Sequence, residues 1–203
     1  MLFEHGLPTA HKSARTAGDA GLRDAGFRWG DRGTHTSRTI MLDELRAVLE
    51  RCPPDASRDD YLTAIHDDNC LGKRTAATRK LSSQRLSKLY GLDPSITLFR
   101  VMRRCWYADR DAKELLAMLL ALARDPLLRA SAPSVLGLRL GEELARQHMT
   151  DAIRGAIGER LSDSTLDKVV RNAASDRVND FEALLFMKPR PAAWSWRDPV
   201  RAG

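Results

Sequence analysis

The sequence predicts an all-α fold, a helical bundle that contains a helix-turn-helix. Aromatic residues make up only 6% of the 203 residues, and a chain in which Leu, Ala and Arg predominate favours helices over strands. From about residue 40 onward, apolar residues recur at helical spacing. Two of the resulting helices are joined by a short connection that contains Gly72. These three observations argue against a fold built on β-sheets.

The composition places the chain among soluble globular proteins. Hydrophobic residues account for 43% and charged residues for 30% of it, which are ordinary values for that class. The longest apolar run, Leu115 to Ala123, has nine residues, against about 20 for a membrane-spanning helix. Because no apolar segment follows a basic start, we expect a cytoplasmic protein. The three cysteines are far apart, which predicts reduced thiols rather than disulfides.

Three helices are expected between residues 37 and 91. The first begins at Ser37 or Thr39 and ends at Cys52-Pro53-Pro54, since proline lacks the backbone donor. The second, about 58–69, begins with a capping box of Ser57 and Asp60 and carries Tyr61, Leu62 and Ile65 on its apolar face. The third, about 75–90, begins at Thr75 and is closed by Gly91.

Further helices are expected from residue 95 to residue 175. One follows Asp93-Pro94, and another begins at Asp109. The apolar face of that second helix is expected to consist of Leu115, Leu116, Leu119 and Leu122. Asp125-Pro126 ends it and starts the next turn. Helical stretches then follow at about 134–148, 151–160 and 164–175, the last capped by Ser162 or Asp163.

Four segments result from this pattern. Residues 1–36, with six of the 13 glycines, form a loose Gly-rich lead. Residues 37–108 form an N-terminal helical domain with the helix-turn-helix, and 109–175 form a C-terminal helical domain. Residues 176–203 hold an amphipathic piece, Phe181 to Met187, and a Pro/Trp tail, consistent with a truncated or frame-changed gene.

Positive charge is concentrated in one segment. Residues 72–104 carry nine Lys and Arg against a single acid, Asp93, so this segment holds +8 while the whole chain has a formal charge of +6. Such density predicts a site for a polyanion, with double-stranded DNA as the partner. Cations at a helix start oppose the helix dipole, which a bound phosphate would relieve. The predicted DNA-binding residues are Lys73, Arg74, Thr75, Thr78, Arg79, Lys80, Arg85, Lys88, Arg103 and Arg104.

Two alternatives accompany that interpretation. The basic residues can instead form a solvated face that is balanced by acids of the preceding helix, namely Asp59, Asp60, Asp67 and Asp68. The chain can also be a helical scaffold that docks an acidic protein, anchored by Leu115 to Leu122 or by Trp194 and Trp196. Because Gln84 is the one amide on the basic helix, DNA binding is expected to be phosphate-dominated and largely independent of sequence.

A second candidate DNA contact lies in residues 161–172. Lys168, Arg171 and Asn172 share a helix face there, although Asp163 and Asp167 oppose DNA. The nucleotide-binding and hydrolase motifs were searched for without a match, and we expect no enzyme, cofactor or metal. The run from His66 to Asn69 offers metal-compatible groups, but adjacent residues of a helix point in different directions.

The stretch Asp68-Asn69-Cys70-Leu71-Gly72-Lys73-Arg74-Thr75-Ala76-Ala77-Thr78-Arg79, followed by Arg85-Leu86 and Tyr90-Gly91-Leu92-Asp93-Pro94, resembles the BrxA family of bacterial BREX phage-defence systems. Residues 111–128 and 161–166 are similar too, so the resemblance spans about 37–175. It implies an all-helical, helix-turn-helix or winged-helix-like protein that binds double-stranded DNA without catalysis, beside other phage-defence proteins. The DNA-facing positions that it implies are Lys73, Arg74, Thr75, Thr78, Arg79 and Lys80. Beyond Ser175 the chain departs from the second winged-helix-like unit of that family.

Overall fold

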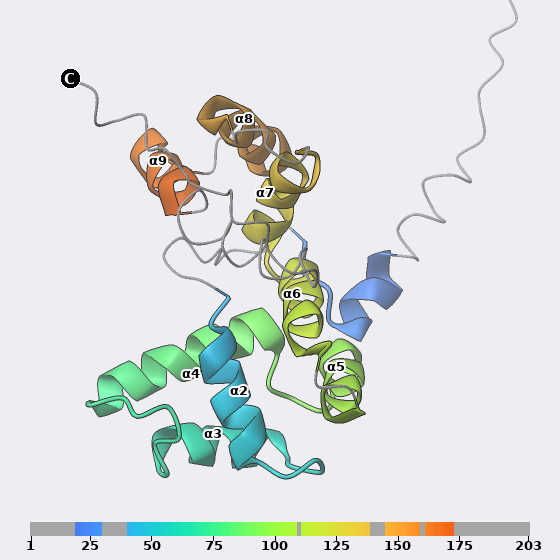
Figure 1. Cartoon of the computed structure of the whole chain (residues 1–203), viewed down its shortest axis with the longest axis vertical. Helices are drawn as coiled ribbons and strands as arrows, with labels where there is room; N and C mark the ends of the chain where they lie inside the picture. Colours follow the sequence, from blue (N-terminus) through green and yellow to red (C-terminus); the bar gives the residue numbers. More distant parts are fainter. Residues whose placement is uncertain (1–18, 30–39, 109–110, 139–144, 159–160, 173–203) are drawn as a thin grey trace, which may run out of the picture. The chain divides into compact units, whose positions relative to one another are not determined.

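The computed structural model describes residues 19–29, 40–108, 111–138, 145–158 and 161–172, and the regular structure of these residues is entirely helical (Figure 1). Residues 19–25 form a helix. The labelled helices are α2 (Leu42–Arg51), α3 (Arg58–His66), α4 (Ala76–Tyr90), α5 (Thr97–Ala108), α6 (Lys113–Arg124), α7 (Pro126–Leu136), α8 (Arg146–Ile157) and α9 (Asp163–Asn172). The all-α prediction is confirmed for these residues. None of the described helices is long and apolar enough to cross a membrane.

The described residues fall into two compact units. The first comprises 19–29 and 40–129, and the second comprises 130–138, 145–158 and 161–172. The boundary therefore lies within α7, whereas the sequence pattern placed it near residue 108. In the first unit α4 packs against both α3 and α6, α2 packs against α3, and α5 packs against α6. In the second unit α8 packs against α9.

The predicted start of α3 is confirmed. The backbone N–H of Asp60 donates to Ser57 Oγ at 3.3 Å, and the Ser57 N–H donates to Asp60 Oδ2 at 2.7 Å, which completes the capping box. Hydrogen bonds from Ser57 lower the pKa of the Asp60 carboxyl. The helix ends at His66 rather than near residue 69, because Asn69 has a left-handed φ of 52°.

The boundaries of α4 follow the prediction as well. Thr75 caps its first turn, and Gly91 ends it with a φ of 93°, a backbone conformation that side chains oppose. A Cβ at Gly91 would also lie 2.9 Å from Ile96 Cδ1. The start of α2 differs from expectation, since Met41 occupies the N-cap without a side-chain hydrogen bond. The expected caps Ser37 and Thr39 lie outside the described residues.

The predicted apolar face of α6 is wrong in part. Leu115 and Leu119 are exposed, while Leu116 and Leu122 are half-buried. The buried residues of α6 are Ala117, Met118, Leu120, Ala121, Ala123 and Arg124. Helix–helix distances depend on the side chains at the contact, so a face with small alanines allows α4 and α5 to approach closely. The expected cap Asp109 lies outside the described residues.

The region from residue 125 onward differs from the prediction in two helices, one of which is α8, found at Arg146–Ile157 instead of about 151–160. As expected, α7 begins at Pro126, and Asp125 Oδ1 accepts the N–H groups of Leu127 and Leu128 at 2.8 and 3.1 Å. The helix expected over 134–148 is wrong, because α7 ends at Leu136 and residues 137 and 138 are not helical. Ser162 caps α9 as predicted, with its Oγ 3.4 Å from the N–H of Thr165. Phe181 to Met187 and the Pro/Trp tail lie outside the described residues.

Part of the N-terminal lead is structured. Arg124 donates to the carbonyl of Gly26 at 2.7 Å, and the N–H of Arg28 donates to the carbonyl of Ala123 at 3.1 Å. The Arg129 guanidinium lies 5.3 Å from the ring centroid of Trp29. Residues 19–29 are thus attached to α6 and the start of α7, rather than forming a loose lead. Burial lowers the pKa of Arg124 to about 10.

The core of the first unit is centred on Tyr61 and Phe99, whose rings meet edge to face with centroids 5.5 Å apart. Over the Tyr61 ring lies the guanidinium of Arg103, at 5.4 Å. Arg103 is only 5% exposed. It donates to the carbonyls of Ala56 at 3.1 Å and Pro53 at 2.5 Å, and so joins α5 to the connection between α2 and α3.

We predict that Arg103→Met lowers the free energy of unfolding by about 2–4 kcal/mol, because two carbonyls lose a charged donor. Arg104, the next residue, is exposed and serves as the control. Arg104→Met should change the free energy of unfolding by no more than about 0.5 kcal/mol. Urea denaturation followed by circular dichroism measures both values. Equal changes in the two variants would show that the bonds of Arg103 contribute nothing to stability.

Candidate nucleic-acid interface

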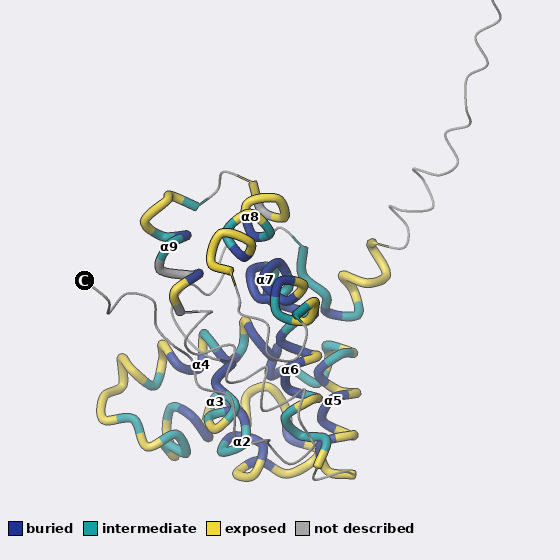
Figure 2. Tube along the Cα trace, turned by 45° about the horizontal axis from the view of Figure 1, so that its top comes forward, coloured by how far each residue is buried: buried dark blue, intermediate teal, exposed yellow. Residues whose placement is uncertain are grey.

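The helix α4 has two chemically distinct faces. Its inner face carries the buried residues Ser82, Ser83, Leu86, Leu89 and Tyr90. With 3.6 residues per turn, the opposite face carries Ala77, Lys80, Leu81, Gln84 and Lys88, and all five are exposed. Figure 2 shows exposed residues along the N-terminal half of this helix. We call these five residues the outward face of α4.

No carboxylate neutralises the outward face among the residues that the structure describes. The sequence of α4 contains no Asp or Glu, and none of the observed ion pairs involves one of its side chains. Two of the acids expected to balance it are engaged elsewhere. Asp60 caps α3, and Asp68 pairs with Arg51 at 2.5 Å. The balanced-face alternative therefore finds no support in these ion pairs.

The approach to α4 is less cationic than the sequence indicates. The Nζ atom of Lys73 lies 3.1 Å from Glu44 Oε1, and both side chains are mostly buried. The backbone N–H of Lys73 donates to Asn69 Oδ1 at 2.9 Å. Lys73 thus fixes the loop before α4 and has its charge balanced. Arg74, the next residue, is exposed and has no ion pair in the described part of the chain.

The hydroxyls of Thr75 and Thr78 are engaged with each other's backbone. Thr75 Oγ1 accepts the N–H of Thr78 at 3.1 Å, and Thr78 Oγ1 accepts the N–H of Thr75 at 3.3 Å. The Thr78 hydroxyl also donates to the carbonyl of Thr75 at 2.8 Å. Both residues therefore form the cap of α4, and the Thr78 hydroxyl proton is donated inside this turn. That Thr75 and Thr78 contact phosphate stays a prediction. Ala76 and Ala77 are the first two residues of α4, so their backbone N–H groups have no acceptor inside the helix.

The remaining predicted residues do not share one surface. Arg79 and Arg85 are half-buried, and the Nε atom of Arg79 is buried without a hydrogen-bond partner. Arg103 is buried, with its guanidinium bound to carbonyls, so its inclusion among the DNA contacts is corrected. Arg104 is exposed, but on α5. The structure thus retains Arg74, Lys80 and Lys88 as exposed cations at the start and on the outward face of α4.

Sequence reasoning left three residues of this face, Ala77, Leu81 and Gln84, outside the predicted set. Gln84 was noted only as the single amide, and Leu81 was not singled out. Leu81 is 45% exposed, on the same face of α4 as Lys80 and Gln84. The helical repeat of the two lysines, Lys80 and Lys88, was a signal that could have identified Leu81 and Gln84.

The second candidate, in α9, is largely balanced by acids. Arg171 pairs with Asp167 at 2.6 Å, Arg146 also pairs with Asp167, and Arg154 pairs with Asp163. The side chains of Lys168 and Asn172 lie outside the described residues. This ion-pair network joins α8 to α9 and leaves little free positive charge for DNA.

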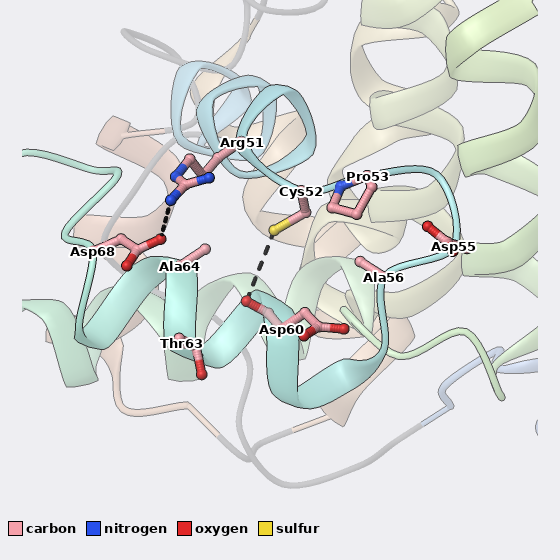
Figure 3. A pocket seen from close by; sticks show the side chains of 9 residues that line it. All are labelled: Arg51, Cys52, Pro53, Asp55, Ala56, Asp60, Thr63, Ala64 and Asp68. Atoms are coloured by element: carbon pink, nitrogen blue, oxygen red, sulfur yellow. Dashed lines mark hydrogen bonds and ion pairs between the residues drawn. The ribbon is translucent and has the colours of Figure 1, made fainter.

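A polar pocket of about 300 Å³ lies between the end of α2 and the helix α3 (Figure 3). Its lining includes Arg51, Cys52, Asp55, Asp60 and Asp68. Several of these groups already have partners, since Arg51 pairs with Asp68 and the Cys52 thiol lies 3.8 Å from the Asp60 carbonyl. Burial raises the pKa of Cys52, so its thiol is a poor nucleophile near neutral pH.

The predicted metal-compatible run also takes part in local packing. His66 Nε2 lies 2.7 Å from Ser83 Oγ and so links α3 to α4. Across the described residues, no group of three or more His, Cys, Asp and Glu side chains is placed to hold a metal ion. Neither this run nor the pocket offers a reactive constellation, and the outward face of α4 is the candidate site.

We predict that Thr75→Ala lowers the free energy of unfolding by about 1 kcal/mol, because the first turn of α4 loses its capping acceptor. Thr75→Ser should keep most of that stability. Thr63, an exposed threonine inside α3, is the matched control, and Thr63→Ala should not destabilise the protein. Thermal unfolding compares the variants, and an unchanged melting temperature for Thr75→Ala would contradict the capping role.

Comparisons of the chain with protein-family models, with curated proteins and with solved structures found no match. Membership of the BrxA family, which the residues around Gly72 predict, therefore stays a prediction. What supports a function is the arrangement of side chains on α4.

Proposed function

We propose that this protein is a non-catalytic double-stranded DNA-binding protein that uses the outward face and the N-terminal end of α4. The observation that carries the proposal is the set of three exposed cations, Arg74 just before α4 and Lys80 and Lys88 on it, together with the absence of any acid from this helix. A polyanion with regularly spaced phosphates matches such a row. A role in phage defence beside other defence proteins rests on the BrxA resemblance and is part of the same proposal.

The order of α3 and α4 supports a helix-turn-helix mode of binding. In that mode the second helix enters the major groove, and the first helix crosses the backbone. Helix α3 packs against α4, and His66 bonds Ser83 between them. The inner face of α4 is thereby held, while its N-terminal half presents exposed residues. In this proposed mode, Arg74 and Lys88, which lie near opposite ends of the helix, contact phosphates on either side of a groove.

An acidic protein surface is the second candidate partner. The specific observation is the exposed pair Leu115 and Leu119 on α6, which sits one helical turn apart and could anchor a partner. Binding to an acidic protein that survives nuclease treatment, without any shift of duplex DNA at low salt, would favour this scaffold function over DNA binding.

We predict that replacing Arg74, Lys80 and Lys88 together with Gln flattens the dependence of log Kd on log salt by about two to three units, at about 0.9 per phosphate contact. Fluorescence anisotropy on a mixed-sequence duplex at several salt concentrations measures the slope.

The matched control replaces Arg146, Arg154 and Arg171 with Gln, which removes the same formal charge from α8 and α9. The ion pairs lost there are exposed and contribute little stability. An identical slope in the wild type and the α4 variant would remove the three residues from the interface.

A further inference from the structure

The outward face of α4 contains more than charge. Ala77 and Gln84 are seven residues apart and therefore lie at nearly the same angle around the helix axis. They form the middle line of the outward face. Lys80 and Leu81 flank that line on its two sides, and all four side chains are exposed. The face thus places a 45% exposed leucine, Leu81, beside an exposed amide and an exposed cation.

We infer that Gln84 and Leu81 read base edges in the major groove and select A·T pairs, an inference that rests on the proposed function. Glutamine pairs in bidentate fashion with the N6 and N7 groups of adenine, and an apolar side chain contacts the methyl group of thymine. Gln84 and Leu81 are three residues apart, so they are neighbours on the helix surface. One side chain recognises adenine while the other covers the adjacent thymine methyl.

The surroundings of these two residues fit insertion into a groove. Ala76 and Ala77, in the first turn of α4, are small and exposed, so the helix can approach the floor of the groove closely. Arg74 and Lys88 remain at the two ends for the phosphate backbones. We take the occupant to be duplex DNA rather than an acidic protein because Arg74 and Lys88 stand on either side of Leu81 and Gln84. The sequence of α4 contains no acid that would repel DNA. This differs from the sequence-based expectation of largely sequence-independent binding.

The test compares duplexes that differ only in base chemistry, at one salt concentration. The wild type should bind an alternating A·T duplex at least about fivefold tighter than an alternating G·C duplex. Replacement of thymine by uracil removes the methyl group, and replacement of adenine by deaza-adenine removes N7. Each change alters the major groove alone and should weaken wild-type binding.

Two variants assign these effects to residues. Gln84→Ala should lose the sensitivity to deaza-adenine, and Leu81→Ala should lose the sensitivity to uracil, while both keep the salt dependence of the wild type. Gln147→Ala on α8 and Leu119→Ala on α6 remove the same side-chain types from other exposed positions and should behave like the wild type. Circular dichroism confirms that each variant is folded.

The outcomes separate this inference from the proposed function. Equal wild-type affinity for all duplexes would overturn base readout and leave DNA binding intact. Base preferences that persist in both α4 variants would likewise overturn the assignment to Gln84 and Leu81. Absence of any duplex binding at low salt would overturn the readout and the proposed function together.

Discussion

Two buried arginines hold the first unit together, and neither pairs with a carboxylate in the described part of the chain. Arg103 binds the carbonyls of Pro53 and Ala56, and Arg124 binds the carbonyl of Gly26 while its second nitrogen lies 3.4 Å from that of Ser87. A buried cation that lost these acceptors would be strongly destabilising. Each guanidinium therefore holds together segments that are far apart in the chain. Arg103 links α5 to the connection between α2 and α3. Arg124 links α6 to Gly26 and to the last turn of α4.

The second arginine acts directly on α4, because Arg124 donates to the carbonyl of Ser87 in the last turn of that helix. Its C-terminal half is packed against neighbours, with Leu86, Leu89 and Tyr90 buried and Ser87 bound by Arg124. Its N-terminal half has exposed residues on most sides. A helix anchored at one end and open at the other can insert its free end into a groove without repacking the core. The rigidity needed for recognition comes from the buried inner face of α4, and the accessibility needed for contact comes from its outward face, where Gln84 and Lys88 stay exposed even in the C-terminal half.

Much of the local structure was predictable from the sequence, because its signals are local. Ser57 with Asp60, Thr75 with Gly91, and Asp125 with Pro126 define helix ends through hydrogen bonds and backbone geometry within a few residues. The candidate site was predictable only in outline. Charge counting locates the basic region in the sequence, but it cannot distinguish a cation bound to distant carbonyls from one that faces solvent.

Arg103 and Lys73 were misjudged for one physical reason, which is a partner distant in sequence. Arg103 meets carbonyls 47 and 50 residues away, and Lys73 meets a carboxylate 29 residues away. The leucines of α6 were misjudged for a related reason. Periodicity identified several apolar residues on the helix, but which side is buried depends on the packing of α4 and α5 against α6, which no local pattern records.

The caps of α3 and α4 differ in a way that bears on function. Both are capping boxes, but α3 uses Ser57 with the carboxylate of Asp60, whereas α4 uses the two neutral residues Thr75 and Thr78. An acid at the third helical position would have stabilised α4 further by its interaction with the helix dipole. It would also have repelled a phosphate at this end of the helix. The neutral cap satisfies the backbone while leaving the positive end of the dipole, and the adjacent Arg74, uncompensated by any carboxylate of α4. The first turn of α4 is therefore stabilised in a manner that remains compatible with a bound polyanion, and this distinguishes it from α3.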